Sequence, residues 1–174
     1  LRCLLMITIS ASLFASKAES GVEINGSWHE KTETRERFCL NGEWQFHPLA
    51  GTAKDDWEAP PAIGEVDGYD WEMKMRVPGV WKAGPWPHER QFFDPGYADH
   101  LGKCLRAWYR REFFVPAEWV SKTVRLEFGS VGYKAEIYIN RKHAGTHIGG
   151  ISPFEIDITG CINPGRVNEI LVFN

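Results

Sequence analysis

Carboxylate side chains are the first residues in this sequence that could carry chemistry. Two carboxyl groups held about 5 Å apart can act on one bond as general acid and nucleophile. Glu155 and Asp157 are two residues apart, so they share one face of a strand while the apolar residues that alternate with them share the other. This pattern predicts a solvated strand edge rather than a reacting pair. Asp55 and Asp56 lie in a polar turn, so no catalytic pair is predicted.

Histidines and cysteines give no stronger site. His88, His100, His143 and His147 have no Ser, Cys or carboxylate that the sequence places beside them, which predicts surface or hydrogen-bonded structural roles. The sequence has no CxxC pair and no cysteine–histidine set at ligand spacing. We therefore predict neither a metal nor a cofactor.

The segment 48–102 is dense in Pro, Gly, Trp and Asp and predicts a long loop region. A loop of this length is usually functional or packed against a neighbour. Its residues Trp81, Trp86, Asp94 and Tyr97 are the candidates for a contact surface. The alternative, that these aromatic rings only pin the loop to its own domain, stays open.

Short strands are the elements that must position these residues. Trp44 and Phe46 alternate on one face, and Trp44, Tyr109 and Phe113 are predicted to lie in the core. The predicted strands are residues 43–46, 73–77, 108–115, 123–128, 135–140, 154–159 and 170–173, the last one buried on both faces. Short strands with turn signals and no amphipathic helix predict an all-β fold, an antiparallel β-sandwich or jelly roll.

The first 18 residues are predicted to be an export signal. Arg2 precedes an apolar run over residues 3–15, and Ser16 and Ala18 offer small residues before the cut. The alternative is a buried first strand or helix. The run is too short to span a bilayer, so we expect an exported, periplasmic or extracellular protein without a membrane span. Residues 19–37 then form a polar leader, and residues 38–174 the domain.

Charge argues against one class of partner. The formal net charge is −3, and the basic residues form no long block. Phosphate binding needs clustered Lys and Arg, so nucleic acid is not expected as a partner.

Several ordered motifs carry a resemblance to a known family. They are residues 40–46 (LNGEWQF), 77–81 (VPGVW), 108–113 (WYRREF), 115–116 (VP), 138–140 (YIN), 147–154 (HIGGISPF) and 157–159 (DIT). Residues 40–174 thereby resemble the N-terminal sugar-binding domain of family 2 glycosidases, a galactose-binding-like jelly roll found in β-galactosidases, β-glucuronidases and β-mannosidases. The stretch 147–154 is most similar to the glucuronidase-like branch. Arg141 is a departure, because the family often has Gly after the Asn of this turn.

The resemblance implies a noncatalytic domain of a secreted β-glycosidase. The acid/base and nucleophile would be glutamates of a downstream barrel, and the chain would be truncated before it, which leaves the run 170–173 without a neighbouring strand. Aromatic rings stack on sugar faces and carboxylates accept hydroxyl hydrogen bonds, so Trp81, Trp86, Asp94 and Tyr97 would touch the carbohydrate substrate or the barrel. The alternatives are a free-standing carbohydrate-binding module and a structural remnant of a broken gene.

Overall fold

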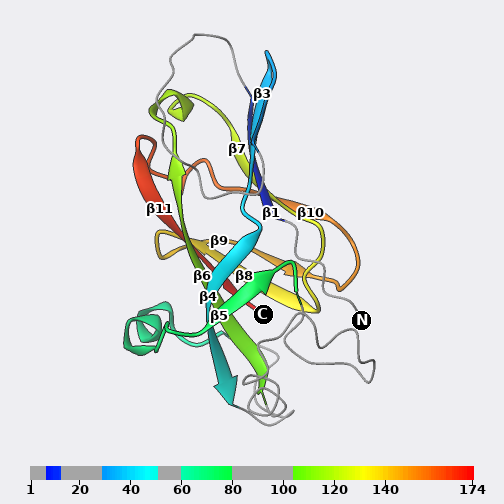
Figure 1. Ribbon diagram of the computed structural model, residues 1–174, viewed down its shortest axis with the longest axis vertical. Helices are drawn as coiled ribbons and strands as arrows, with labels where there is room; N and C mark the ends of the chain where they lie inside the picture. The colour runs from blue at the N-terminus through cyan, green and yellow to red at the C-terminus, as the bar shows by residue number, and fades with distance from the viewer. Residues whose placement is uncertain (1–6, 13–28, 51–59, 80–103) are drawn as a thin grey trace.

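Two antiparallel β-sheets pack face to face in the protein. The computed structural model describes residues 7–12, 29–50, 60–79 and 104–174 (Figure 1). Within these ranges the chain forms a six-stranded sheet, a five-stranded sheet and two short 3₁₀ helices, η1 (Ile63–Gly68) and η3 (Ala117–Trp119). The predicted all-β sandwich is confirmed.

The six-stranded sheet contains the long strands of the chain. Its order is β5 (Lys74–Val77), β4 (Gly42–Ala50), β6 (Cys104–Val115), β11 (Arg166–Phe173), β8 (Lys134–Ile139) and β9 (Lys142–Ile148). Strand β11 lies between β6 and β8, so the prediction that the run 170–173 lacks a neighbouring strand is wrong. Its residues Ile170, Leu171 and Val172 are fully buried, which confirms that both faces of this strand are covered.

The five-stranded sheet has the order β10 (Phe154–Asp157), β7 (Val124–Phe128), β1 (Ile7–Ser12), β3 (Arg35–Cys39) and β2 (His29–Lys31). Strand β1 comes from the segment predicted to be an export signal, and here it forms the first strand that the alternative expected; export itself stays a prediction. Strands β2 and β3 overlap residues 19–37, which the sequence predicted to be a polar leader. Glu36 of β3 is buried there and accepts hydrogen bonds from His29 and Lys31 of β2 and from Trp119.

The main core fills the space between the sheets. Trp44, Tyr109 and Phe113 lie in it with exposed fractions of 5 % or less, which confirms their prediction as core residues, and Phe46 lies there beside Trp44. The Trp44 indole donates a hydrogen bond of 2.8 Å to the Leu40 carbonyl, so its polar atom is satisfied inside the apolar layer. Burial of each large apolar side chain of this kind stabilises the fold by about 1.5–3 kcal/mol.

The β8–β9 hairpin turns on two residues with positive φ, Asn140 at 49° and Arg141 at 67°. A two-residue turn of this kind matches the twist of paired strands. The Asn140 amide donates to the Asn168 side chain at 2.7 Å and to the Cys161 carbonyl at 2.8 Å. The sequence analysis missed β9, whose Gly145 lets Ile156 approach: a Cβ there would lie 2.7 Å from the Ile156 Cδ1.

Candidate functional site

The loop residues that the sequence singled out, Trp81, Trp86, Asp94 and Tyr97, lie outside the described residues. The described ends of their segment are nevertheless informative. Val77 pairs with Gly42 at one end of β4, and Cys104 pairs with Ala50 at the other. Strands rise about 3.3 Å per residue, so the described ends of this connection lie about 26 Å apart in the direction of β4.

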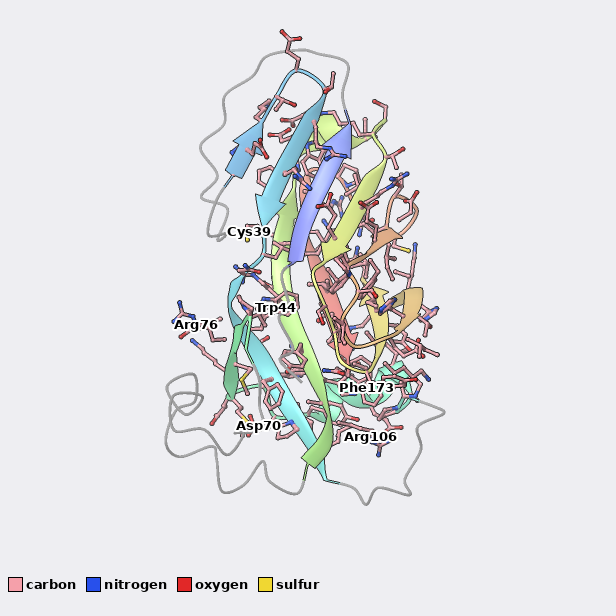
Figure 2. The ribbon with its side chains drawn as sticks, turned by 90° about the vertical axis from the view of Figure 1, so that its right-hand side faces the viewer. Cys39, Trp44, Asp70, Arg76, Arg106 and Phe173 are labelled. Atoms are coloured by element: carbon pink, nitrogen blue, oxygen red, sulfur yellow. The ribbon has the colours of Figure 1, made fainter. Side chains whose placement is uncertain are left out.

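A second group of aromatic residues lies on the outer face of the six-stranded sheet. Helix η1 (Ile63–Gly68) and the residues that follow it pack against this face, next to Arg106 and Phe173 (Figure 2). Val66 and Trp108 are fully buried there. We call the half-buried residues around this contact, His47, Tyr69, Trp71, Arg106 and Arg110, the aromatic–arginine face.

Ring stacking and hydrogen bonds fix the aromatic members. The His47 and Tyr69 rings are stacked, with centroids 4.2 Å apart and planes at 4°. His47 Nδ1 donates to the Asp70 carbonyl at 3.0 Å, and the Trp71 indole donates to the Val66 carbonyl at 3.0 Å. These contacts use the polar atoms of the loop locally, so its rings keep a fixed orientation. Burial, and then the Glu65 carboxylate, raise the pKa of the Tyr69 hydroxyl.

Arginines tie the face to the sheet. The Arg110 guanidinium lies 5.4 Å from the Trp71 ring centre and donates to Glu169 at 2.6 Å. Arg141, the residue that stands where the family often has Gly, also donates to Glu169 and pairs with Asp67 of η1 at 3.0 Å. Charge-assisted contacts of this geometry orient both partners. Arg141 therefore links the β8–β9 turn to the η1 loop.

A buried carboxylate, Glu136, lies on β8 and contacts residues of β9. Glu136 of β8 accepts hydrogen bonds from Thr146 and from His143, the latter at 2.9 Å, and pairs with Lys134 at 3.1 Å. Burial acts to raise the pKa of Glu136, but the hydrogen bonds from Thr146, His143 and Lys134 outweigh it and hold the pKa below its usual value of 4.5. Glu136 is thus a satisfied anion, not a proton donor at neutral pH.

Two cross-strand pairs bring carboxylates opposite each other. Glu155 registers with Glu127 between β10 and β7, and Glu112 with Glu169 between β6 and β11. Arginines neutralise three of these four carboxylates: Glu127 pairs with Arg37, Glu155 with Arg125 at 3.3 Å, and Glu169 with Arg110 and Arg141. Like charges directly opposite destabilise a ladder unless they are compensated. These carboxylates act as ladder residues.

Glu155, Asp157 and two of the four histidines named from the sequence lie within the described residues. Glu155 and Asp157 are exposed on β10, which confirms the solvated edge. His143 has the hydrogen-bonded role described above, and His147 stacks on Phe154 with ring centres 3.7 Å apart. His88, His100, Asp55 and Asp56 lie outside the described residues. Among the residues with assigned structure, no three His, Cys, Asp or Glu side chains gather closely enough to hold a metal ion.

The chemistry available at the aromatic–arginine face is stacking and hydrogen bonding. Aromatic rings beside guanidinium groups suit a polar, ring-bearing ligand or a protein surface. The sequence analysis missed this group, because its members come from three segments that only the pairing of β4 with β5 and β6 brings together. The aromatic content of residues 69–71 was the available signal. In the same described part of the chain, no helix is long and apolar enough to cross a membrane.

Comparisons with known proteins agree with this architecture. Residues 38–174 match the family model described as "Glycosyl hydrolases family 2, sugar binding domain". The chain is similar to a β-glucuronidase of Paenibacillus borealis, with 35 % identity over 143 residues that cover 81 % of this chain and 21 % of the relative. It is also similar to a β-galactosidase of Thermoanaerobacter pseudethanolicus, with 33 % identity over 49 % of this chain and 11 % of the relative.

A solved structure of a β-glucuronidase is also similar to this chain. The crystal structure of Ruminococcus gnavus β-glucuronidase superposes with a TM-score of 0.53 at 31 % identity, covering 77 % of this chain and 20 % of that one. The chain therefore spans about a fifth of the length of the glucuronidases that it matches.

Proposed function

We propose, from the premise that the chain belongs to the family of sugar-binding domains of family 2 glycosyl hydrolases, that it acts as a noncatalytic N-terminal domain of an exported β-glycosidase. In this role the sandwich supports a catalytic barrel in the same polypeptide, and the loop over residues 80–103 contributes to the rim of the substrate pocket. The observation that carries the proposal is the family match over residues 38–174, together with a relative of which the matched region is only 21 %.

The chemistry of the described residues supports a noncatalytic role. Hydrolysis of a glycosidic bond usually needs a protonated carboxyl group and a second, ionised one about 5 Å away. In the described strands one or both carboxylates of each opposed pair form ion pairs with arginines, and Glu136 is held ionised by three donors. Such groups bind and orient neighbours, so the reacting carboxylates are assigned to the barrel.

The position of the loop ends supports a role at the rim. The connection between β5 and β6 begins beside one end of β4 and ends beside the other. Loops placed on a rigid sandwich in this way commonly carry binding residues. Trp81, Trp86, Asp94 and Tyr97 are the residues proposed to touch sugar or barrel.

Two measurements test the proposal. The chain alone is expected to release no aryl group from β-glucuronide, β-galactoside or β-mannoside substrates; turnover that survives repurification would contradict a noncatalytic role. Titration calorimetry against a glycan panel is expected to show weak binding at most, lowered further by Trp86→Ala. Tight binding that Trp86→Ala leaves unchanged would favour a free-standing carbohydrate-binding module.

The DNA beyond codon 174 separates the remaining possibilities. A continuing frame that encodes a barrel with two glutamates supports the proposed role. A stop codon would favour the binding module or a structural remnant. Mass spectrometry of the mature protein tests export independently, since cleavage after Ala18 places Glu19 at the new N-terminus.

A further inference from the structure

Strand β1 holds the five-stranded sheet together. It pairs antiparallel with β3 on one side, from Thr8 opposite Cys39 to Ser12 opposite Arg35. On the other side it pairs antiparallel with β7, from Ile7 opposite Phe128 to Ala11 opposite Val124. Strands β3 and β7 are neighbours of β1 and not of each other, so each owes one of its ladders to this segment (Figure 2).

Apolar and polar residues alternate along β1 in the same register as buried and charged residues alternate along β7. Ile7, Ile9 and Ala11 register with the buried residues Phe128, Leu126 and Val124 of β7, and the intervening Thr8 and Ser10 register with charged residues. Because the side-chain period of a strand is two, a shift by one residue would place every apolar position on the wrong face. The register is therefore specified by the sequence.

The two walls of this position are also connected without β1. Arg37 of β3 forms an ion pair with Glu127 of β7, across the place where β1 runs. Strands that flank a third lie about 9.5 Å apart, a distance that these two long side chains bridge. On the β3 side, Phe38 stacks on Trp119 at 5.1 Å, and the Trp119 indole donates to Glu36 at 3.0 Å. The walls thus have contacts of their own.

We propose that the space between β3 and β7 is a strand-acceptor site. Its ligand is an extended, antiparallel segment of the same polypeptide with apolar residues at alternate positions, and residues 7–12 occupy it here. Main-chain hydrogen bonds on both sides supply affinity, and the alternate core positions supply selectivity. Cleavage after Ala18, which is part of the proposed function, removes the occupant and leaves two open strand edges. Occupancy by residues 7–12 does not depend on that function.

Site-specific proteolysis of the full chain tests the proposal. A protease recognition sequence is inserted after Ala18, and the folded protein is cut without denaturant. We expect the 1–18 fragment to co-elute with the remainder, with those amides of β3 and β7 that face β1 still protected from hydrogen exchange. Separation of the fragment with unchanged melting temperature and unchanged protection would overturn the proposal. A cut protein that becomes a stable dimer would assign the site to a second copy and would equally contradict it.

A peptide-binding experiment is used if the cut protein releases the 1–18 fragment and its melting temperature falls. A synthetic peptide of residues 5–14 should then restore the melting temperature, whereas a peptide of the same composition with its alternation shifted by one residue should not. Failure of both peptides would contradict the proposal. In the intact chain, Ile9→Pro should lower the exchange protection of the β3 and β7 amides that face β1 about tenfold or more, with Ala15→Pro as the matched control. None of these measurements uses glycosidase activity, so they fail or succeed independently of the proposed function.

Discussion

The two sheets of the sandwich differ in how they are covered and assembled. The six-stranded sheet has the main core on one face and a second apolar cluster around Trp108 on the other, and four of its strands come from residues 104–173. The five-stranded sheet draws its strands from both ends of the chain and depends on β1 in its middle. We therefore expect the six-stranded sheet to contribute more to the free energy of unfolding, and the five-stranded sheet to unfold locally more easily.

Removal of residues 1–18 should produce the largest effect. The shortened chain loses both ladders of β1, so β3 and β7 present unpaired edges, which promote association between molecules. We expect a lower melting temperature and concentration-dependent oligomers in sedimentation velocity, compared with the full chain. A sharp cooperative melt with a strictly monomeric profile would mean that the five-stranded sheet does not need β1.

Truncation of a buried tryptophan tests whether the outer cluster is a second core. Trp108 and Trp44 have exposed fractions of 0 % and 1 % on opposite faces of the six-stranded sheet. Trp108→Ala and Trp44→Ala should each lower the free energy of unfolding by about 3–5 kcal/mol, measured by urea denaturation. Trp108→Phe serves as the control and should cost less. A cost below about 1 kcal/mol for Trp108→Ala would make the outer cluster a surface feature.

Acid should weaken both sheets through one carboxylate in each. Burial opposes ionisation of Glu36, but hydrogen bonds from Trp119 and His29 and the charge of Lys31 hold its pKa below 4.5, and the pKa of Glu136 is lowered in the same way. Because both pKa values are depressed on folding, this stabilisation is complete above 4.5 and is lost as the pH falls through the folded-state values.

Unfolding in urea at about pH 7 and about pH 3.5 measures this loss. The stability difference between the two pH values should shrink in Glu36→Gln and in Glu136→Gln, each by an amount on the order of 1–3 kcal/mol. An unchanged difference in both variants would show that other carboxylates control the acid sensitivity.

The smallest effect is expected at Arg141. Arg141→Ala removes the contacts to Asp67 and Glu169 and keeps a non-glycine residue at a φ of 67°, so we expect a loss of about 1 kcal/mol. Arg141→Gly loses the same contacts but relieves the backbone by about 1 kcal/mol, which should leave stability nearly unchanged. Equal destabilisation by both substitutions would show that the positive φ carries no cost here.

The sequence predicts most of the fold because alternation marks one-sided burial directly. Residues 124–128 and 135–139 alternate cleanly, and both segments are strands with the predicted residues inside. Strand β9 has Lys, His and Gly in place of alternating apolar residues and exists through its pairing with β8, which no local pattern reports. The apolar run at the N-terminus fits an export signal and a strand equally well, since both need the same side chains.

The aromatic–arginine face is harder to predict from the sequence than the strands are. His47 and Tyr69 are 22 residues apart, and their stacking follows from the return of the chain along β5 beside β4. Propensity and periodicity describe neighbours along the chain, whereas this contact depends on tertiary pairing. The roles of Trp81, Trp86, Asp94 and Tyr97 stay predictions.

The pairing of β1 with β7 also has a consequence in time. Ile7 lies opposite Phe128, so its partner strand is made only after about 120 further residues. At about 5–20 residues per second, the N-terminal segment waits roughly 6–24 s on the ribosome before its sheet can close. Throughout that interval the segment has no β7 to pair with and stays accessible to any factor that binds extended apolar sequences. The slow closure of one sheet would therefore give the predicted export recognition its opportunity, and the same six residues would form a strand only in chains that are not recognised in that interval.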